Sequence, residues 1–118
     1  MPESLPLLWT EVPLHADALE LLRGRARLSG PGVPAADAAN PGFEFEAAAA
    51  AIVGSRRLYD AAAFASAPRL KVIARTGIGY DNVDVPAASA AGVCALNTPE
   101  APTESTAEFA VALMFAVA

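Results

Sequence analysis

The stretch Leu70–Asp84, LKVIARTGIGYDNVD, constrains the fold of this chain more than any other. Its short apolar run Val72–Ala74, followed at once by turn residues, is typical of a strand buried on both faces, as in a parallel sheet. Gly77 and Gly79 come next and flank a single residue. Such glycines permit a positive φ or the close approach of a ligand to the backbone, and exposed amides there can hold an anion. Because open α/β sheets bind ligands at the carboxyl ends of their strands, this loop is the first candidate site.

The rest of the chain alternates between strand patterns and helix patterns. Further strands are expected at Leu5–Thr10, Ala26–Ser29, Ala47–Val53 and Val93–Leu96. Helices are expected at His15–Arg23, at Asp60–Ala65 and from the N-cap Asp84, with Pro86 in the first turn, to Gly92. The segment Gly30–Phe43 is rich in Pro, Gly and Ala and predicts a loop with one helical turn at Ala35–Ala39. This order predicts an α/β fold in which a parallel sheet carries helices on both faces.

The last segment, from Thr103 to Ala118, predicts a helix of unusual composition. Ser105 and Glu108 have the spacing of a capping box, and Thr103 with Thr106 offers an alternative cap. Every residue from position 109 onward is apolar, so this helix is expected to be buried on all sides. A helix that stops within an apolar run, with nothing to cover it, suggests a fragment of a longer protein. A membrane span is the alternative, but this run falls short of the ~20 residues that cross a bilayer.

Charge and cysteine content narrow the expected partners and location. The net charge of −5 disfavours a nucleic-acid partner, whose phosphates attract clustered Lys and Arg. The arginines at 23, 25 and 27 are expected to be a solvated helix end. Cys94 is the only cysteine, and the first residues, MPESLP, show no secretory pattern, which together indicate a reducing, cytoplasmic setting. Cys94 itself is expected in mid-strand as a small core residue. No metal site and no membrane partner are expected.

The segment ARTGIGYDNVDVPAASAAGVCALNTPEAPTESTAEFAVALMFAVA resembles the N-terminal half of the D-isomer-specific 2-hydroxyacid dehydrogenase family. Phosphoglycerate dehydrogenase, glyoxylate/hydroxypyruvate reductase and NAD-type formate dehydrogenase are members of that family. Three motifs occur in the family's order: G-x-G-x-D-N-x-D, N-T-P and T-A-E. The resemblance covers Ala49–Ala118, and before Ala49 it rests on element order alone. It implies a flavodoxin-like substrate-binding domain over residues 1–103, with residues 104–118 beginning the helix that leads to a coenzyme domain absent from this chain.

The resemblance also implies an activity. Family members are oxidoreductases that transfer hydride between NAD(P)H and a small 2-oxo or 2-hydroxy acid, and the full-length protein is expected to be a homodimer. NAD or NADP would be bound mainly by the absent coenzyme domain. The family's catalytic Arg, Glu and His lie in that domain and beyond it, so no catalytic residue is assigned here and this chain alone is expected to be inactive. The alternative is a non-enzymatic flavodoxin-like module that binds a small carboxylate, or docks a partner through its apolar last helix.

In the resembled family the loop at Gly77 grips the substrate, which implies that the amides of Ile78 and Gly79 bind its carboxylate. Two other interpretations stay open. The pattern G-x-G after a strand also suits a dinucleotide fingerprint, with Glu100 about 20 residues on. However, Asn82 stands where the third glycine belongs, and no helix starts at the loop. The second interpretation is that the loop is a purely structural turn.

Three further positions are implied as site residues. Ser55 and Arg56 follow the third expected strand, at the same sheet edge as the glycines. The family often has Arg-Ser at this turn; Ser55 matches, but Gly54 occupies the arginine position. Arg56 either supplies the missing cation from one residue on or is a solvated charge. Thr103, at a helix N-terminus that favours anions, either contacts the coenzyme or merely caps the helix. Residues 80–82 are expected to fix the glycine loop by Asx-type hydrogen bonds.

Overall fold

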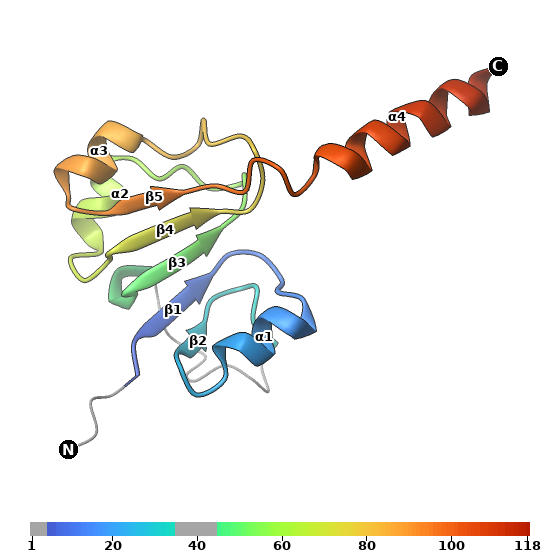
Figure 1. The fold of residues 1–118 in the computed structure, drawn as a ribbon. Coiled ribbons are helices and arrows are strands. Elements are labelled where there is room, and N and C mark those ends of the chain that lie inside the picture. Colours follow the sequence, from blue (N-terminus) through green and yellow to red (C-terminus); the bar gives the residue numbers. More distant parts are fainter. Residues whose placement is uncertain (1–4, 35–44) are drawn as a thin grey trace.

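A computed structural model describes residues 5–34 and 45–118 of the chain. Its centre is a five-stranded, entirely parallel sheet with the order β2-β1-β3-β4-β5 (Figure 1). The strands are β1 (Leu7–Thr10), β2 (Arg27–Ser29), β3 (Ala50–Val53), β4 (Val72–Arg75) and β5 (Cys94–Leu96). This order is that of flavodoxin-like doubly wound folds, so the expected α/β class is confirmed. The helical turn expected at Ala35–Ala39 lies outside the described residues.

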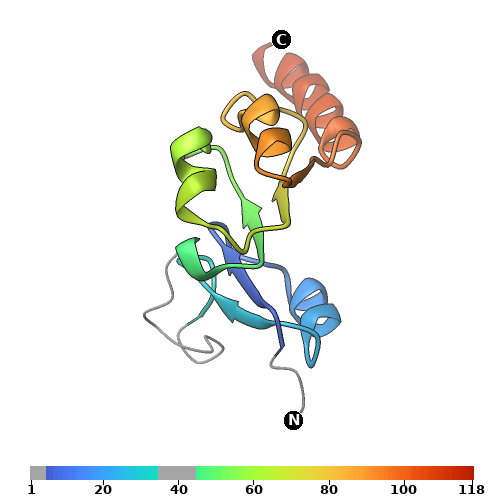
Figure 2. The same ribbon diagram turned by 90° about the vertical axis from the view of Figure 1, so that its left-hand side faces the viewer.

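The helices lie on both faces of the sheet because the chain adds β2 on one side of β1 and then adds β3, β4 and β5 on the other side. They are α1 (Ala16–Leu22), α2 (Ala61–Ser66), α3 (Val85–Ala90) and α4 (Thr103–Val117), with a 3-10 turn, η1, at Phe45–Ala47. Right-handed crossovers place the helix of the β1-to-β2 connection on one face and those of the connections from β3 to β5 on the other. Figure 2 shows this arrangement, with α1 on one side of the strands and α2 on the other.

The core lies between the sheet and the three elements that cover one of its faces, η1, α2 and α3. Trp9 packs edge-on against Phe45 with ring centroids 5.4 Å apart, and Phe45 packs against Tyr59 at 5.5 Å. Around these rings lie buried residues of the strands and helices: Ala51, Val53, Phe64, Leu70, Ile73, Val83, Ala88 and Val93. Aromatic burial of this kind contributes much of the stability of a small domain. The expected strand at Ala47–Val53 begins only at Ala50, because η1 occupies its first position.

The other face of the sheet is only partly covered. Figure 1 shows α1 beside β1 and β2, and no described helix lies over β4 and β5 on that face. Of the run expected to be buried on both faces, only Ile73 is fully buried, whereas Val72 and Ala74 are half-buried. Cys94 is exposed and is the first residue of the edge strand β5, so the expected mid-strand core position is wrong. Successive side chains of a strand point to opposite faces of the sheet, so Val93 is buried on the core face and Cys94 is exposed on the uncovered face.

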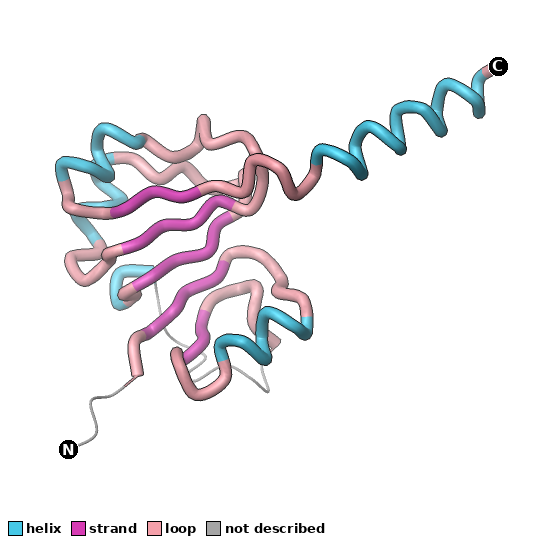
Figure 3. Tube along the Cα trace, in the orientation of Figure 1, coloured by secondary structure: helices cyan, strands magenta, loops and turns pink. Residues whose placement is uncertain are grey.

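Helix α4 differs from its expected form at its start and in its surroundings. It begins at Thr103 with Pro102 as N-cap, and no side chain caps it. Ser105 is therefore already within the helix, and the expected capping box with Glu108 is wrong. All residues from Thr103 onward are exposed, so the expected burial on all sides is not provided by the described chain. Figures 1 and 3 show α4 extending away from the sheet. Among the described residues, no helix combines the length and apolarity needed to cross a bilayer.

Candidate functional site

Two loops leave the carboxyl edge of the sheet side by side. In the parallel pairing of β3 with β4, Val53 lies opposite Arg75, the last residue of each strand. The Thr76 amide then donates to the Val53 carbonyl at 3.0 Å, which keeps the chains together beyond the strands. The segment Gly54–Arg57 and the glycine loop Thr76–Gly79 therefore start next to each other, as the convergence of loops at this edge in Figure 1 shows. This is the edge at which such sheets bind ligands.

The glycine loop is held from one side by the end of β5. Gly77 has φ +134°, a conformation that side chains disfavour, and its amide donates to the Thr98 hydroxyl at 2.7 Å. The Thr98 amide donates back to the Gly77 carbonyl at 3.0 Å, and the Asn97 side-chain amide donates to the Ile78 carbonyl at 2.9 Å. The N-T-P motif thus fixes the glycine loop through the Gly77 amide and the carbonyl groups of Gly77 and Ile78.

These contacts leave two consecutive backbone donors free. Within the described residues, the amides of Ile78 and Gly79 donate to no protein acceptor. The Ile78 side chain is 49% exposed, and a Cβ added at Gly79 would meet only the Asp81 carboxylate, at 3.4 Å. Successive free amides in a turn form a site that suits an anion. No helix begins at this loop, because α3 starts only at Val85 behind its cap Asp84, which argues against the dinucleotide fingerprint.

Arg75 is a candidate that the sequence analysis missed. Its Nη1 donates to the Thr76 carbonyl, and a Cβ at Gly77 would come within 2.7 Å of the same nitrogen, so the guanidinium lies against the glycine loop. Its Nε is buried and has no hydrogen-bond partner among the described residues. A guanidinium fork matches the geometry of a carboxylate. Its position as the last strand residue before the glycines is the signal that could have identified it.

Ser55 and Arg56 lie at the expected edge, on the loop after β3. Both side chains are exposed and, in the part of the chain that the structure describes, neither forms a hydrogen bond or an ion pair. The loop around them is well held. The Asn82 side-chain amide donates to the carbonyls of Gly54 and Arg57, at 2.9 Å each. Asn82 therefore links the two site loops across the sheet edge, and the expected Asx-type bond to its own backbone is wrong.

Thr103 is placed apart from these loops. It is the first residue of α4, its side chain is exposed, and its hydroxyl donates to the Pro99 carbonyl at 3.4 Å. This bond is local to the turn before α4, and no side chain caps the helix, so the capping role expected as one alternative is wrong. The possible coenzyme contact by Thr103 stays a prediction.

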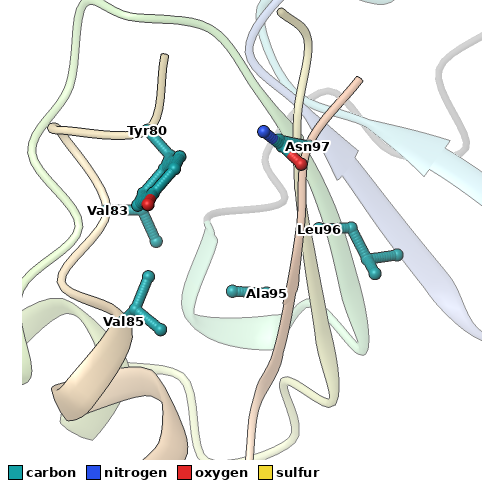
Figure 4. A pocket seen from close by; sticks show the side chains of 6 residues that line it. All are labelled: Tyr80, Val83, Val85, Ala95, Leu96 and Asn97. Carbon is teal, nitrogen blue, oxygen red and sulfur yellow. The ribbon is translucent and has the colours of Figure 1, made fainter. Parts of the chain in front are cut away.

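A hollow of about 240 Å³ lies beside the glycine loop, between Tyr80, the start of α3 and the edge strand β5. Figure 4 shows the side chains that line it: Tyr80, Val83, Val85, Ala95, Leu96 and Asn97. Its walls carry no charged group, and the Asn97 side-chain amide already donates to Ile78. A small acid would lose its hydration in such a hollow without gaining a cationic partner. The free amides beside Arg75 therefore suit a carboxylate better.

The sequence matches the family described as D-isomer specific 2-hydroxyacid dehydrogenase, catalytic domain, over residues 12–117. The chain belongs to this family. The resemblance that the three motifs carry is confirmed, and it extends well before Ala49. Membership of this family of oxidoreductases does not favour the alternative of a non-enzymatic module.

Two curated relatives and one solved structure show how far the likeness reaches. Over 67 residues the chain is 49% identical to the D-3-phosphoglycerate dehydrogenase of Mycobacterium tuberculosis, covering 57% of this chain and 13% of that protein. Over 59 residues it is 48% identical to the glyoxylate reductase of Korarchaeum cryptofilum, covering 50% of this chain and 18% of that protein. A structure from Thermus thermophilus is 33% identical with a TM-score of 0.76, covering 95% of this chain and 36% of the other. The chain thus spans well under half the length of these relatives.

Proposed function

We propose that this chain is the substrate-binding part of an NAD(P)-dependent D-2-hydroxyacid dehydrogenase, and that its glycine loop holds the carboxylate of a small 2-oxo or 2-hydroxy acid. The observation that carries the proposal is the pair of free amides at Ile78 and Gly79, beside the guanidinium of Arg75. The two amides and the guanidinium can form charge-assisted hydrogen bonds with the carboxylate of the acid. Ser55 and Arg56, on the adjoining loop, face the remainder of the acid.

The two curated relatives support a carboxylate as the recognised group. One is named for phosphoglycerate and the other for glyoxylate, acids that differ in size and charge but share a carboxylate next to the reacting carbon. A site that holds this shared group serves every substrate of the class. Holding the carboxylate also orients the neighbouring carbonyl toward a hydride donor, which is catalysis by positioning.

The same proposal assigns different roles to the two parts of the protein. Residues 1–103 form the substrate-binding domain, and residues 104–118, which make up the rest of α4, lead toward a part that binds NAD or NADP, with Thr103 as a contact at the boundary. The coenzyme supplies the hydride, and this chain supplies the grip on the acid. By itself the chain is therefore expected to be inactive and to leave NADH unbound.

The experiment is a titration of the isotope-labelled chain, followed by the NMR signals of its backbone amides. Pyruvate should shift the signals of Ile78 and Gly79 saturably, whereas pyruvamide, which has the same shape without the negative charge, should not. Gly79→Val places a branched side chain beside the free amides, where it crowds the bound carboxylate. The loss of one charge-assisted hydrogen bond then weakens pyruvate binding about tenfold.

Ala101→Val is the matched control, because it adds the same side chain at an exposed loop position outside the two site loops. It should bind pyruvate as the unmodified chain does. If pyruvamide shifts the two amides as strongly as pyruvate, or if Gly79→Val binds pyruvate normally, the loop is a structural turn and the proposal fails.

A further inference from the structure

Glu11 lies at the carboxyl edge of the sheet and belongs to none of the three sequence motifs. It follows the last residue of β1, and its amide donates to the Ile52 carbonyl of β3 at 2.9 Å. The strand order reverses between β1 and β3, since the chain runs outward to β2 on one side and to β4 and β5 on the other. Ligands of doubly wound sheets bind at the carboxyl side of such a switch point. Glu11 is therefore an acidic residue at the expected floor of the ligand crevice.

One oxygen of the Glu11 carboxylate accepts two hydrogen bonds from the loop after β3. The Gly54 amide donates to Oε2 at 2.7 Å, and the Tyr59 hydroxyl donates to the same atom at 3.2 Å. Bonds to an ionised acceptor are shorter and stronger than neutral ones. The carboxylate thus joins both ends of the segment 54–59, which contains Ser55 and Arg56.

Tyr59 is a rigid anchor for this carboxylate. Its side chain is fully buried, its amide donates to the Asn82 carbonyl at 2.8 Å, and its carbonyl accepts from the Asp84 amide at 2.9 Å. The tyrosine is therefore fixed from the β4–α3 connection, and through its hydroxyl it fixes Glu11 in turn. The backbone of Tyr59 is thus held by two hydrogen bonds and its ring is buried, so its hydroxyl has a fixed position beside Glu11.

Arg57, in the same segment, packs its guanidinium against the aromatic rings of the core. Its guanidinium carbon lies 4.8 Å from the ring centroid of Phe45, 5.5 Å from that of Tyr59 and 5.7 Å from that of Trp9. These distances are those of cation–π contacts. Glu11 holds the Gly54 amide and Arg57 lies on the rings, so Ser55 and Arg56 lie between two fixed points, and neither is hydrogen-bonded to another of the described residues.

We propose that Glu11 is a positioning residue that holds Ser55 and Arg56 where they contact the substituent of the bound acid, on the far side from its carboxylate. The inference rests on the proposed function, because it takes the amides of Ile78 and Gly79 as the carboxylate grip. Glu11 touches no ligand itself. It determines which acids bind well, by fixing the loop that meets the part in which those acids differ.

The test compares two acids that differ only in that part. Pyruvate ends in a methyl group, whereas hydroxypyruvate carries a hydroxyl that Ser55 or Arg56 can bond. The unmodified chain should bind hydroxypyruvate about fivefold more tightly than pyruvate, as expected for one added hydrogen bond. Glu11→Ala should abolish this preference and leave pyruvate affinity within about twofold of its original value, since the carboxylate grip is untouched. A residue that merely stabilised the fold would weaken both acids alike.

Two further variants keep the test decisive if Glu11→Ala folds poorly. Glu11→Gln retains an oxygen acceptor for both donors and should restore most of the preference. Tyr59→Phe removes only the hydroxyl donor and should give an intermediate preference. Glu20→Ala, an exposed glutamate on α1 that pairs with Arg23, is the matched control and should bind both acids normally. The Gly54 amide signal should move upfield in Glu11→Ala, which shows directly that the bond is lost.

The outcomes separate the two proposals. If neither acid shifts the Ile78 and Gly79 signals of the unmodified chain, the proposed function fails. If the acids bind there but hydroxypyruvate gains nothing, or if Glu11→Ala keeps the preference, the positioning role of Glu11 is overturned while the carboxylate grip stands.

Discussion

Tyr59 shows at the scale of a single residue how the site edge is joined to the core. Its ring packs against Phe45, and its hydroxyl reaches the Glu11 carboxylate. Burial raises the pKa of the Tyr59 hydroxyl well above its usual range, and the negative charge of Glu11 raises this pKa further. Ionised Tyr59 would place a second, buried negative charge beside that of Glu11, so the folded chain keeps the proton.

This pKa shift predicts a loss of stability in alkali. Below pH about 10, folded and unfolded chains both hold the Tyr59 proton. Above it the unfolded chain releases the proton and the folded chain does not, so the free energy of unfolding falls by about 1.4 kcal/mol per pH unit until the folded pKa is reached. Urea unfolding of the unmodified chain and of Tyr59→Phe between pH 8 and 11 should show this fall only with the tyrosine present. Tyr80→Phe changes a 56% exposed ring and should keep the original pH dependence; an equal fall in Tyr59→Phe would contradict the prediction.

Single residues also mark where sequence reasoning succeeds and fails. Gly77 could be predicted as a special backbone position because few other residues take a positive φ. The partners of Asn82 could not, since its bonds to Gly54 and Arg57 join positions 28 and 25 residues away and local turn chemistry predicts none of them. Arg75 was overlooked because, in sequence, a charged residue after an apolar run only marks the end of a strand.

At the scale of elements, the helices of the core are short and depend on their first residues. Helices α2 and α3 have six residues each, and helices of that length are unstable in isolation. The Asp84 carboxylate accepts the Ala87 amide at 2.9 Å, and Asp60 accepts the Ala63 amide at 3.0 Å. Each cap satisfies an amide that the helix itself cannot, which is why these helix starts were predictable from sequence.

Loss of the Asp84 cap should destabilise the domain measurably. Asp84→Ala leaves the Ala87 amide without its acceptor, and the free energy of unfolding should fall by about 1 kcal/mol. In Asp84→Asn, which keeps a capping oxygen, the free energy of unfolding should fall by at most a few tenths of that amount. Thermal unfolding followed by circular dichroism provides the comparison, with Asp81→Ala as the control because that aspartate is exposed and caps no helix. Equal stability of Asp84→Ala and the unmodified chain would show that packing alone holds α3.

The elements that differ from expectation do so for a tertiary reason. The segment of α4 was predicted from Thr103, as the structure has it, but its expected caps were wrong, because Pro102 stands at the N-cap and no side chain caps the helix. The exposure of Cys94 follows from β5 being an edge strand with one uncovered face, and sheet order is not visible in a local pattern of apolar residues. In contrast, the alternation of strand and helix over the whole chain was sufficient to predict a parallel sheet.

At the scale of the whole molecule, α4 makes the chain elongated. The chain measures 63 × 34 × 20 Å with a radius of gyration of 16.4 Å, whereas a compact domain of 100 residues has about 13 Å. The large apolar side chains of α4 are at least half exposed, and they are Phe109, Val111, Leu113, Met114, Phe115 and Val117. A surface of this kind is unfavourable in water and drives association.

The chain should therefore associate with itself through α4. Sedimentation velocity over a range of concentrations should show a mass that rises with concentration, together with enhanced fluorescence of a dye that binds apolar surface. Deleting residues 104–118 should leave a monomer with little dye fluorescence and an intact core, since α4 contributes no residue to that core. The undeleted chain with Phe109→Ser and Phe115→Ser, which keeps the helix and removes two of its exposed rings, should associate at markedly higher concentration than the unmodified chain. A monomeric unmodified chain at high concentration, without dye fluorescence, would contradict the prediction and would mean that the apolar side chains of α4 do not drive association.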